Sequence, residues 1–240
     1  MRIAFAFFGI TRSLKYTIDS IKKNFFDILK KNNIDYDIYT HTYYLTNYKN
    51  KRTREKVNDD MINNDEYKLL NANYIQIDKQ ETIKQKLDLH SYRTHKDPWC
   101  TNYNSVDNFI LGCYSKYRVT GMIEETKINY DYVIFIRPDC NYLNKLNLKY
   151  FSYVINNNIA MPNFHCFGKY KINDRFAITN MNSYKIYGYV FEKLLEMSKI
   201  QPLHSETILG EILNINNIKV IKIKFNFSRV RFNGYHQDKF

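Results

Sequence analysis

The sequence predicts an α/β sandwich in which helices flank a mainly parallel central sheet. Short apolar runs alternate with stretches of helical periodicity, and residues 3–10 are apolar without interruption except for one glycine. A central strand that is buried on both faces of a parallel sheet has this character. The 240 residues, 44% of them hydrophobic, fit a single domain spanning 1–240 with its own core.

The N-terminal part predicts a strand–helix–strand unit. Residues 3–10 are the first strand, and after Leu14 apolar residues recur at helical spacing. Ser13 is the predicted cap of that helix. Residues 36–44, rich in Tyr and Thr, predict a second strand, which such a crossover places parallel to the first.

The rest of the chain continues the alternation. Residues 46–66 are charged and rich in asparagine, and we interpret them as a surface excursion or a loosely packed helix. The remaining predicted elements are strands at 70–77, 130–136, 159–165 and 175–179, a loop at 90–104, helices at 106–117, 141–158, 184–199 and 204–213, and an extended tail at 218–230.

Composition restricts the classes of function. The net charge of +12 favours anionic partners, although the lysines are dispersed as on an ordinary solvated surface. The four cysteines form no Cys-x-x-Cys pair, which argues against a zinc ribbon. The chain has neither Gly-x-Gly-x-x-Gly nor a P-loop, which argues against dehydrogenases and nucleoside triphosphatases. The N-terminal apolar run is too short for a leader or a membrane span, so a cytoplasmic protein is expected.

The turn after the first strand is the first candidate site. Gly9 allows a ligand to approach the backbone, and Thr11 and Ser13 offer hydroxyl groups. Arg12 can bind a phosphate, and a helix N-terminus favours an anion. The alternative is a plain strand-to-helix turn.

The strand at 130–136 ends in a second candidate site, Arg137-Pro138-Asp139. In open α/β sheets ligands bind at the carboxyl ends of strands. Asp139 there can bind a divalent metal or a sugar hydroxyl, and Arg137 can neutralise a diphosphate. An Arg–Asp pair that closes the turn is the alternative.

Three further positions can have a chemical role, and each of them also has a purely structural interpretation. Asp174 can act as a general base, oriented by Arg175, or the two can form a salt bridge. Glu206 can face an acceptor, or it can follow Ser205 as part of a helix start. Arg229, with Arg231 on the same face, can reach anionic oxygens or lie on a solvated edge strand.

Five stretches together resemble GT-A-like glycosyltransferases of giant DNA viruses and of bacterial surface-glycan genes. They are residues 3–13, Asp37-Ile38-Tyr39-Thr40-His41, Arg137-Pro138-Asp139, Asn173-Asp174-Arg175-Phe176 and Ser205-Glu206. The resemblance implies a GT-A, Rossmann-like fold, a nucleotide-sugar donor (UDP-linked) and a glycan or glycoprotein acceptor, in the host cytoplasm if the chain is viral. His41 matches as well, but no role is assigned to it.

The resemblance also implies roles at the matching positions. Residues 9–13 would bind the nucleotide, Asp139 would bind a metal (Mn or Mg) or the donor, and Asp174 or Glu206 would lie near the acceptor. GT-A enzymes usually carry Asp-x-Asp at this strand tip, whereas this chain has one carboxylate there. Arg137 or Arg229 is therefore the alternative stabiliser of the leaving diphosphate. The rival function is a non-catalytic basic protein that binds nucleic acid or glycan, although no RNA-binding motif is present and no stable nucleic-acid complex is expected.

Overall fold

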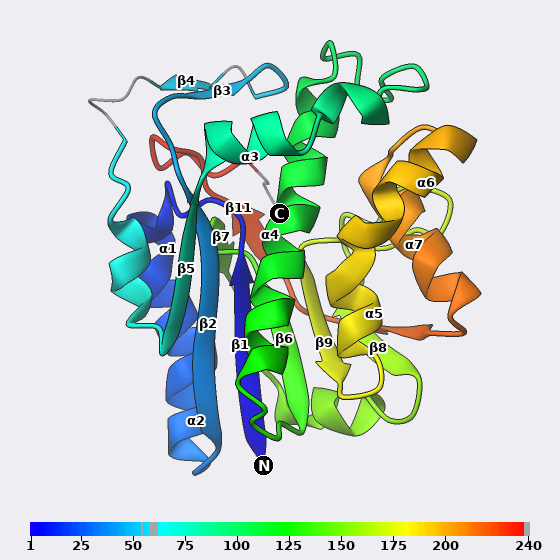
Figure 1. The fold of residues 1–240 in the computed structure, drawn as a ribbon. Helices are drawn as coiled ribbons and strands as arrows, with labels where there is room; N and C mark the ends of the chain where they lie inside the picture. Colours follow the sequence, from blue (N-terminus) through cyan, green and yellow to red (C-terminus); the bar gives the residue numbers. More distant parts are fainter. Residues whose placement is uncertain (54, 58–61, 238–240) are drawn as a thin grey trace.

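The computed structural model describes residues 1–53, 55–57 and 62–237 and contains a seven-stranded sheet with helices on both faces (Figure 1). Its strand order is β10-β8-β9-β6-β1-β2-β5, and β9 alone in this sheet runs antiparallel to its neighbours. The predicted α/β sandwich with a mainly parallel sheet is confirmed. The strands are β1 (Arg2–Phe8), β2 (Asp35–Tyr44), β5 (Tyr74–Lys79), β6 (Tyr132–Ile136), β8 (Asn158–Pro162), β9 (Phe176–Asn180) and β10 (Lys219–Ile223).

Strand β1 is buried on both faces because its side chains alternate between two apolar layers. Ala4 and Ala6 belong to the cluster that includes the long helix α4 (Asn104–Glu125), whereas Phe5 packs edge-on against Phe25 with ring centroids 5.9 Å apart. Burying one such phenylalanine stabilises the fold by roughly 1.5–3 kcal/mol. The first strand is thus fixed between two layers.

The helices divide between the two faces of the sheet (Figure 1). One face carries α1 and α2, which a π-helical turn at Lys22–Phe26 joins, and the other carries α4 to α7. Within the described residues, none of the helices combines the length and apolar character needed to cross a bilayer. The helices besides α4 are α1 (Leu14–Ile21), α2 (Asp27–Lys31), α3 (Gln80–Lys86), α5 (Tyr184–Gly188), α6 (Leu194–Ile200) and α7 (Ser205–Ile215), with 3-10 turns at Glu66–Leu70, Leu89–Tyr92, Leu148–Tyr153 and Tyr189–Lys193.

Two predicted segments differ from the structure. The 46–66 stretch, of which 54 and 58–61 lie outside the described residues, forms a hairpin of β3 (Tyr48–Asn50) and β4 (Glu55–Val57) and not a helix. It is only partly a surface excursion, since Tyr48 and Val57 are buried. The 141–158 stretch contains β7 (Cys140–Tyr142) and a 3-10 turn, and β7 pairs with β11 (Phe227–Arg229).

Strand direction determines where the candidate residues meet. Strands β1 and β6 are parallel, so the turns after Phe8 and Ile136 lie at the same edge. Strand β9 is antiparallel to β6 and pairs Phe176 with Ile136, so the residues that precede β9 lie at this edge too. The β3–β4 hairpin extends beyond the same edge (Figure 1).

Candidate functional site

The turn at residues 9–13 keeps the backbone close to α4. Gly9 has φ +99°, a value that suits glycine, and its N–H donates to Ser115 Oγ at 2.7 Å. Thr11 Oγ1 lies 3.3 Å from Thr42 Oγ1, and Ser13 Oγ donates to the Val230 carbonyl at 2.9 Å. Both hydroxyl groups therefore face the protein interior.

Ser13 occupies the position before α1, yet its side chain makes no capping hydrogen bond there. The predicted cap is wrong because the hydroxyl bonds instead to the C-terminal segment. That bond ties the first turn to the C-terminal segment that carries Arg229 and Arg231.

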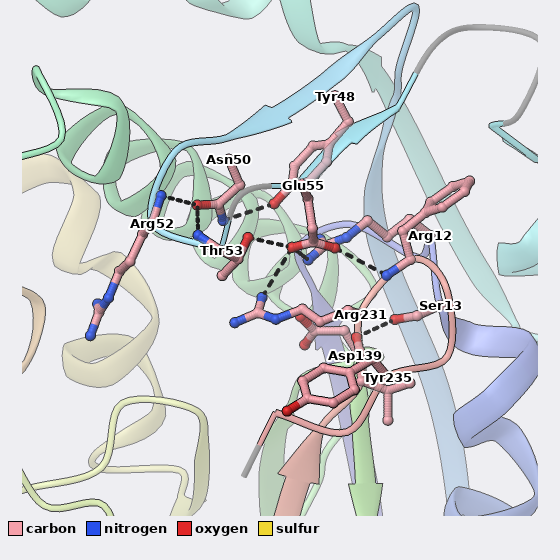
Figure 2. Close-up of polar contacts among 12 residues, drawn as sticks. Arg12, Ser13, Tyr48, Asn50, Arg52, Thr53, Glu55, Asp139, Arg231 and Tyr235 are labelled. Atoms are coloured by element: carbon pink, nitrogen blue, oxygen red, sulfur yellow. Dashed lines mark hydrogen bonds and ion pairs between the residues drawn. The ribbon is translucent and has the colours of Figure 1, made fainter.

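Arg12 is buried under the β3–β4 hairpin (Figure 2). Its Nη2 lies 3.7 Å from Glu55 Oε2, and its guanidinium carbon lies 4.3 Å from the centre of the Tyr48 ring. Arg231 approaches the same carboxylate, with Nη1 3.5 Å from Oε2. Among the described residues, the Nε atoms of Arg12 and Arg231 are buried without a hydrogen-bond partner. The two guanidinium groups thus keep unused capacity for an anion.

The Arg137-Pro138-Asp139 turn holds a bidentate ion pair. Arg137 Nε and Nη2 donate to the two oxygens of Asp139 at 2.8 and 2.5 Å. Burial alone would raise the pKa of Asp139, but the charges of Arg137, Arg12 and Arg231 hold it well below its usual value. Asp139 remains ionised and fixes the orientation of Arg137.

A divalent cation does not fit the groups around Asp139. Both carboxylate oxygens are bonded to Arg137, and further guanidinium groups lie near. Within the described part of the chain, His, Cys, Asp and Glu side chains nowhere gather in a group of three that could hold a metal. Positive charge therefore occupies the place that the resemblance assigns to a metal.

Asp174, Arg175 and Glu206 form a cluster of ion pairs at the start of β9 and α7. Arg175 Nε lies 3.8 Å from Asp174 Oδ1, and its Nη2 lies 3.7 Å from Glu206 Oε1. Burial raises the pKa of Glu206 and the charge of Asp174 adds to this, while the Ser205 hydroxyl donates to its other oxygen. Arg175 thus holds two acidic side chains together.

The pKa of Asp174 is shifted in the opposite direction to that of Glu206. Burial would raise its pKa, but Arg175, Arg137 and Lys116 lower it below the usual value. Its Oδ1 atom is buried and has no hydrogen-bond partner among the described residues. Asp174 is therefore ionised, and its Oδ1, which lies 3.8 Å from Arg175 Nε, can still accept a hydrogen bond.

Two cavities adjoin at this edge, and Phe8, Gly112 and Arg137 line both. The first, ≈ 170 Å³, has a polar wall of Arg12, Arg52, Arg137, Arg229 and Arg231. The second, ≈ 70 Å³, contains Asp174, Lys116 and Ser205 beside apolar side chains. A larger hollow of ≈ 760 Å³ lies away from this edge, beside α2 and the start of β2, and includes none of the candidate residues.

Lys116 is a site residue that sequence reasoning missed. It is 4% exposed, and its Nζ lies 4.1 Å from the centre of the Tyr187 ring. Burial lowers its pKa. A signal was present, since Lys116 interrupts the apolar face of α4 three residues after Cys113 and three before Val119. Glu55 was also missed, and it had no comparable signal.

The predicted residues differ in whether they line one of the two cavities. Gly9, Arg12, Arg137 and Arg229 line the first cavity, and Asp174 and Arg137 line the second. Asp139, Arg175 and Glu206 are buried and line neither cavity; Asp139 pairs with Arg137, and Arg175 pairs with Glu206. Thr11 and Ser13 line neither cavity as well.

Comparison with known proteins gives structural similarity only. No protein-family model matches the chain, and no curated protein matches it. The chain is similar to a solved glycosyltransferase involved in glycosylation of the major capsid of PBCV-1, with 9% identity over 93% of this chain and 82% of that one, at a TM-score of 0.47.

Two other solved structures are similar to a comparable degree. Mouse xyloside xylosyltransferase 1 has 10% identity over 92% of this chain and 84% of that one, at a TM-score of 0.46. The galactosyltransferase LgtC has 11% identity over 89% of this chain and 70% of that one, at a TM-score of 0.48. Glycosyltransferases, the class that the sequence resembles, are thus among these structures. At such values the similarity assigns neither a family nor an activity to this chain.

Proposed function

We propose that residues 1–240 form a glycosyltransferase that moves a sugar from a nucleotide-sugar donor, UDP-linked, to a hydroxyl group of a glycan or protein acceptor. One observation carries the proposal. Two cavities share Arg137 at the carboxyl ends of β1 and β6. One is lined by arginines, and the other holds the ionised carboxylate of Asp174, whose Oδ1 has no hydrogen-bond partner among the described residues. Ligands of open α/β sheets bind at this edge.

In this proposal the first cavity takes the diphosphate of the donor. Guanidinium groups bind phosphate oxygens through paired hydrogen bonds, and fixed positive charge stabilises a leaving diphosphate as it departs. The bidentate bond from Arg137 to Asp139 holds one such group in place. Arginine thus supplies the charge that a metal would otherwise supply.

The second cavity then takes the sugar. Phe8 and Leu209 offer apolar surface, and Lys116 and Asp174 offer a donor and an acceptor for hydroxyl groups. Asp174 is ionised and its Oδ1 can accept a further hydrogen bond, so it can bind a sugar hydroxyl or accept the proton of that hydroxyl as the new bond forms. Arg175 and Glu206 position Asp174 from behind.

A panel of nucleotide sugars, with product detection by mass spectrometry in the presence of EDTA, tests this function. We expect one donor to be hydrolysed or transferred, and Asp174→Asn to lower turnover by about 10²–10⁴-fold, with UDP binding little changed. Asp65→Asn is the matched control, since Asp65 is exposed and pairs only with Lys68 among the described side chains.

Two results would count against the proposal. Turnover that is unchanged in Asp174→Asn removes Asp174 from the reaction. If no donor is bound or turned over and RNA binds tightly in a salt-sensitive manner, the basic binding protein is the better account.

A further inference from the structure

Two arginines that line the first cavity, Arg12 and Arg231, already contact an anionic group that belongs to the protein, the carboxylate of Glu55 (Figure 2). Its Oε2 lies 3.5 Å from Arg231 Nη1 and 3.7 Å from Arg12 Nη2. The Thr53 hydroxyl donates to Oε2 at 2.6 Å, and the Phe232 backbone N–H donates to Oε1 at 3.1 Å. Glu55 is therefore enclosed by donors on several sides.

Glu55 reaches this position from outside the sheet. It begins β4 and pairs with Asn50 of β3, and the Asn50 side chain accepts the N–H groups of Arg52 and Thr53. The hairpin carries no other acidic side chain in its described strands. The hairpin thus brings a single carboxylate to two arginines of the first cavity, Arg12 and Arg231.

The carboxylate satisfies these arginines only in part. Both ion-pair distances exceed those of a charge-assisted hydrogen bond, about 2.7–2.9 Å. The Nε atoms of Arg12 and Arg231 remain buried and without a partner among the described residues. A phosphate group offers more oxygens and more charge than a carboxylate, so it would satisfy more of these donors.

The balance of charges around Arg231 also favours replacement of the Glu55 carboxylate by a phosphate group. Burial lowers the pKa of Arg231, and although Glu55 and Asp139 oppose this effect, the charges of Arg12 and Arg229 add to it. Because Asp139 is already bonded to Arg137 through both oxygens, Glu55 is the carboxylate left to neutralise Arg12 and Arg231.

We propose that Glu55 holds the place of a phosphate group of the donor, and that the donor must displace its carboxylate to bind. The inference rests on the proposed function, because it requires a ligand with phosphate groups. Glu55 is then a specificity-determining residue. Binding exchanges one anion for another, so a ligand gains affinity only when its anionic group exceeds the carboxylate in charge and acceptor number. The contrasting account is a permanent ion pair that fastens the hairpin to the sheet.

The two accounts predict opposite changes in the affinity for pyrophosphate when Glu55 is replaced in Glu55→Gln. The amide keeps a carbonyl oxygen that can accept from Thr53 or Phe232, but it removes the competing charge. We expect the dissociation constant for inorganic pyrophosphate, measured by isothermal titration calorimetry in EDTA, to fall about tenfold. Glu55→Asp keeps the charge but shortens its reach, so it should show a smaller fall. Glu66→Gln is the control, because Glu66 is a buried carboxylate that is paired with Lys15 and does not contact the arginines of the cavity.

Each outcome separates the inference from the proposed function. Pyrophosphate that binds the wild-type protein, but binds Glu55→Gln equally or more weakly, overturns the role of Glu55 and leaves the donor site intact. If neither pyrophosphate nor UDP binds any variant, the proposed function fails and the inference fails with it. Circular dichroism of Glu55→Gln, beside Glu55→Asp and Glu66→Gln, shows whether a loss of binding reflects a loss of fold.

Discussion

His41 links the edge of the sheet to the candidate site through two contacts. Its Nδ1 lies 2.8 Å from Ser115 Oγ, the atom that accepts the Gly9 N–H, and its Nε2 lies 3.2 Å from Asp78 Oδ2. The hydrogen bond from His41 lowers the pKa of Asp78 to about 2. Asp78 is therefore ionised and accepts the proton of Nε2, while the Ser115 hydroxyl donates to the His41 backbone carbonyl at 3.0 Å.

Burial lowers the pKa of His41, and this makes its contribution to stability depend on pH. The unfolded chain takes up a proton near pH 6.5 that the folded chain resists, so the contribution is present above that pH and is lost as the pH falls. We expect His41→Gln to lower the free energy of unfolding by about 1–3 kcal/mol at pH 7.5, and by less at pH 5.5. Urea unfolding at the two pH values measures both, with the exposed His90→Gln as control. A difference that grows at pH 5.5 would contradict this assignment.

Site residues could be predicted from sequence where a strand tip marked them. Arg137 and Gly9 directly follow buried apolar runs, and both line the first cavity. Glu55 could not be predicted, because its contacts to Arg12 and Arg231 cross 43 and 176 residues of sequence. Its place depends on a hairpin whose sequence lacks the apolar alternation that indicates strands.

At the level of elements, the direction of β9 decides whether the site is complete. Asp174 and Arg175 precede this strand, so a parallel β9 would place them at the far edge of the sheet, away from Arg137. The pattern of residues 175–179 indicates a strand but contains nothing that sets its direction. The grouping of these residues with Arg137 is correct only because β9 is antiparallel.

The packing of α5 on α4 can be tested with two glycines. A Cβ atom at Gly188, which ends α5, would overlap the Thr120 side chain, whereas a Cβ at Gly121 of α4 would meet nothing within 4 Å. We expect Gly188→Ala to destabilise the protein by about 1–3 kcal/mol through overpacking. Gly121→Ala should stabilise it by about 0.5–1 kcal/mol through helix propensity. Denaturant unfolding measures the change in the free energy of unfolding for each variant. A stabilising Gly188→Ala would show that α4 and α5 are not packed as described.

Across the whole molecule, the fold gathers charge that the sequence disperses. The arginines of the first cavity come from the first turn, the β3–β4 hairpin, the end of β6 and the C-terminal segment. The net charge of +12 alone favours anionic partners of any kind. Concentration of arginine in one cavity at the functional edge of the sheet favours a compact ligand with adjacent phosphate groups.

The central claim, that this cavity binds a diphosphate through arginine, is tested most directly by calorimetric titration of the wild-type protein with UDP and with uridine in EDTA. We predict that UDP binds and that uridine binds at least about 100-fold more weakly, because each charge-assisted hydrogen bond to phosphate contributes roughly 1.5–3 kcal/mol. The UDP affinity should fall as salt is raised. Equal binding of the two ligands, or UDP binding that appears only after manganese is added, would contradict the account.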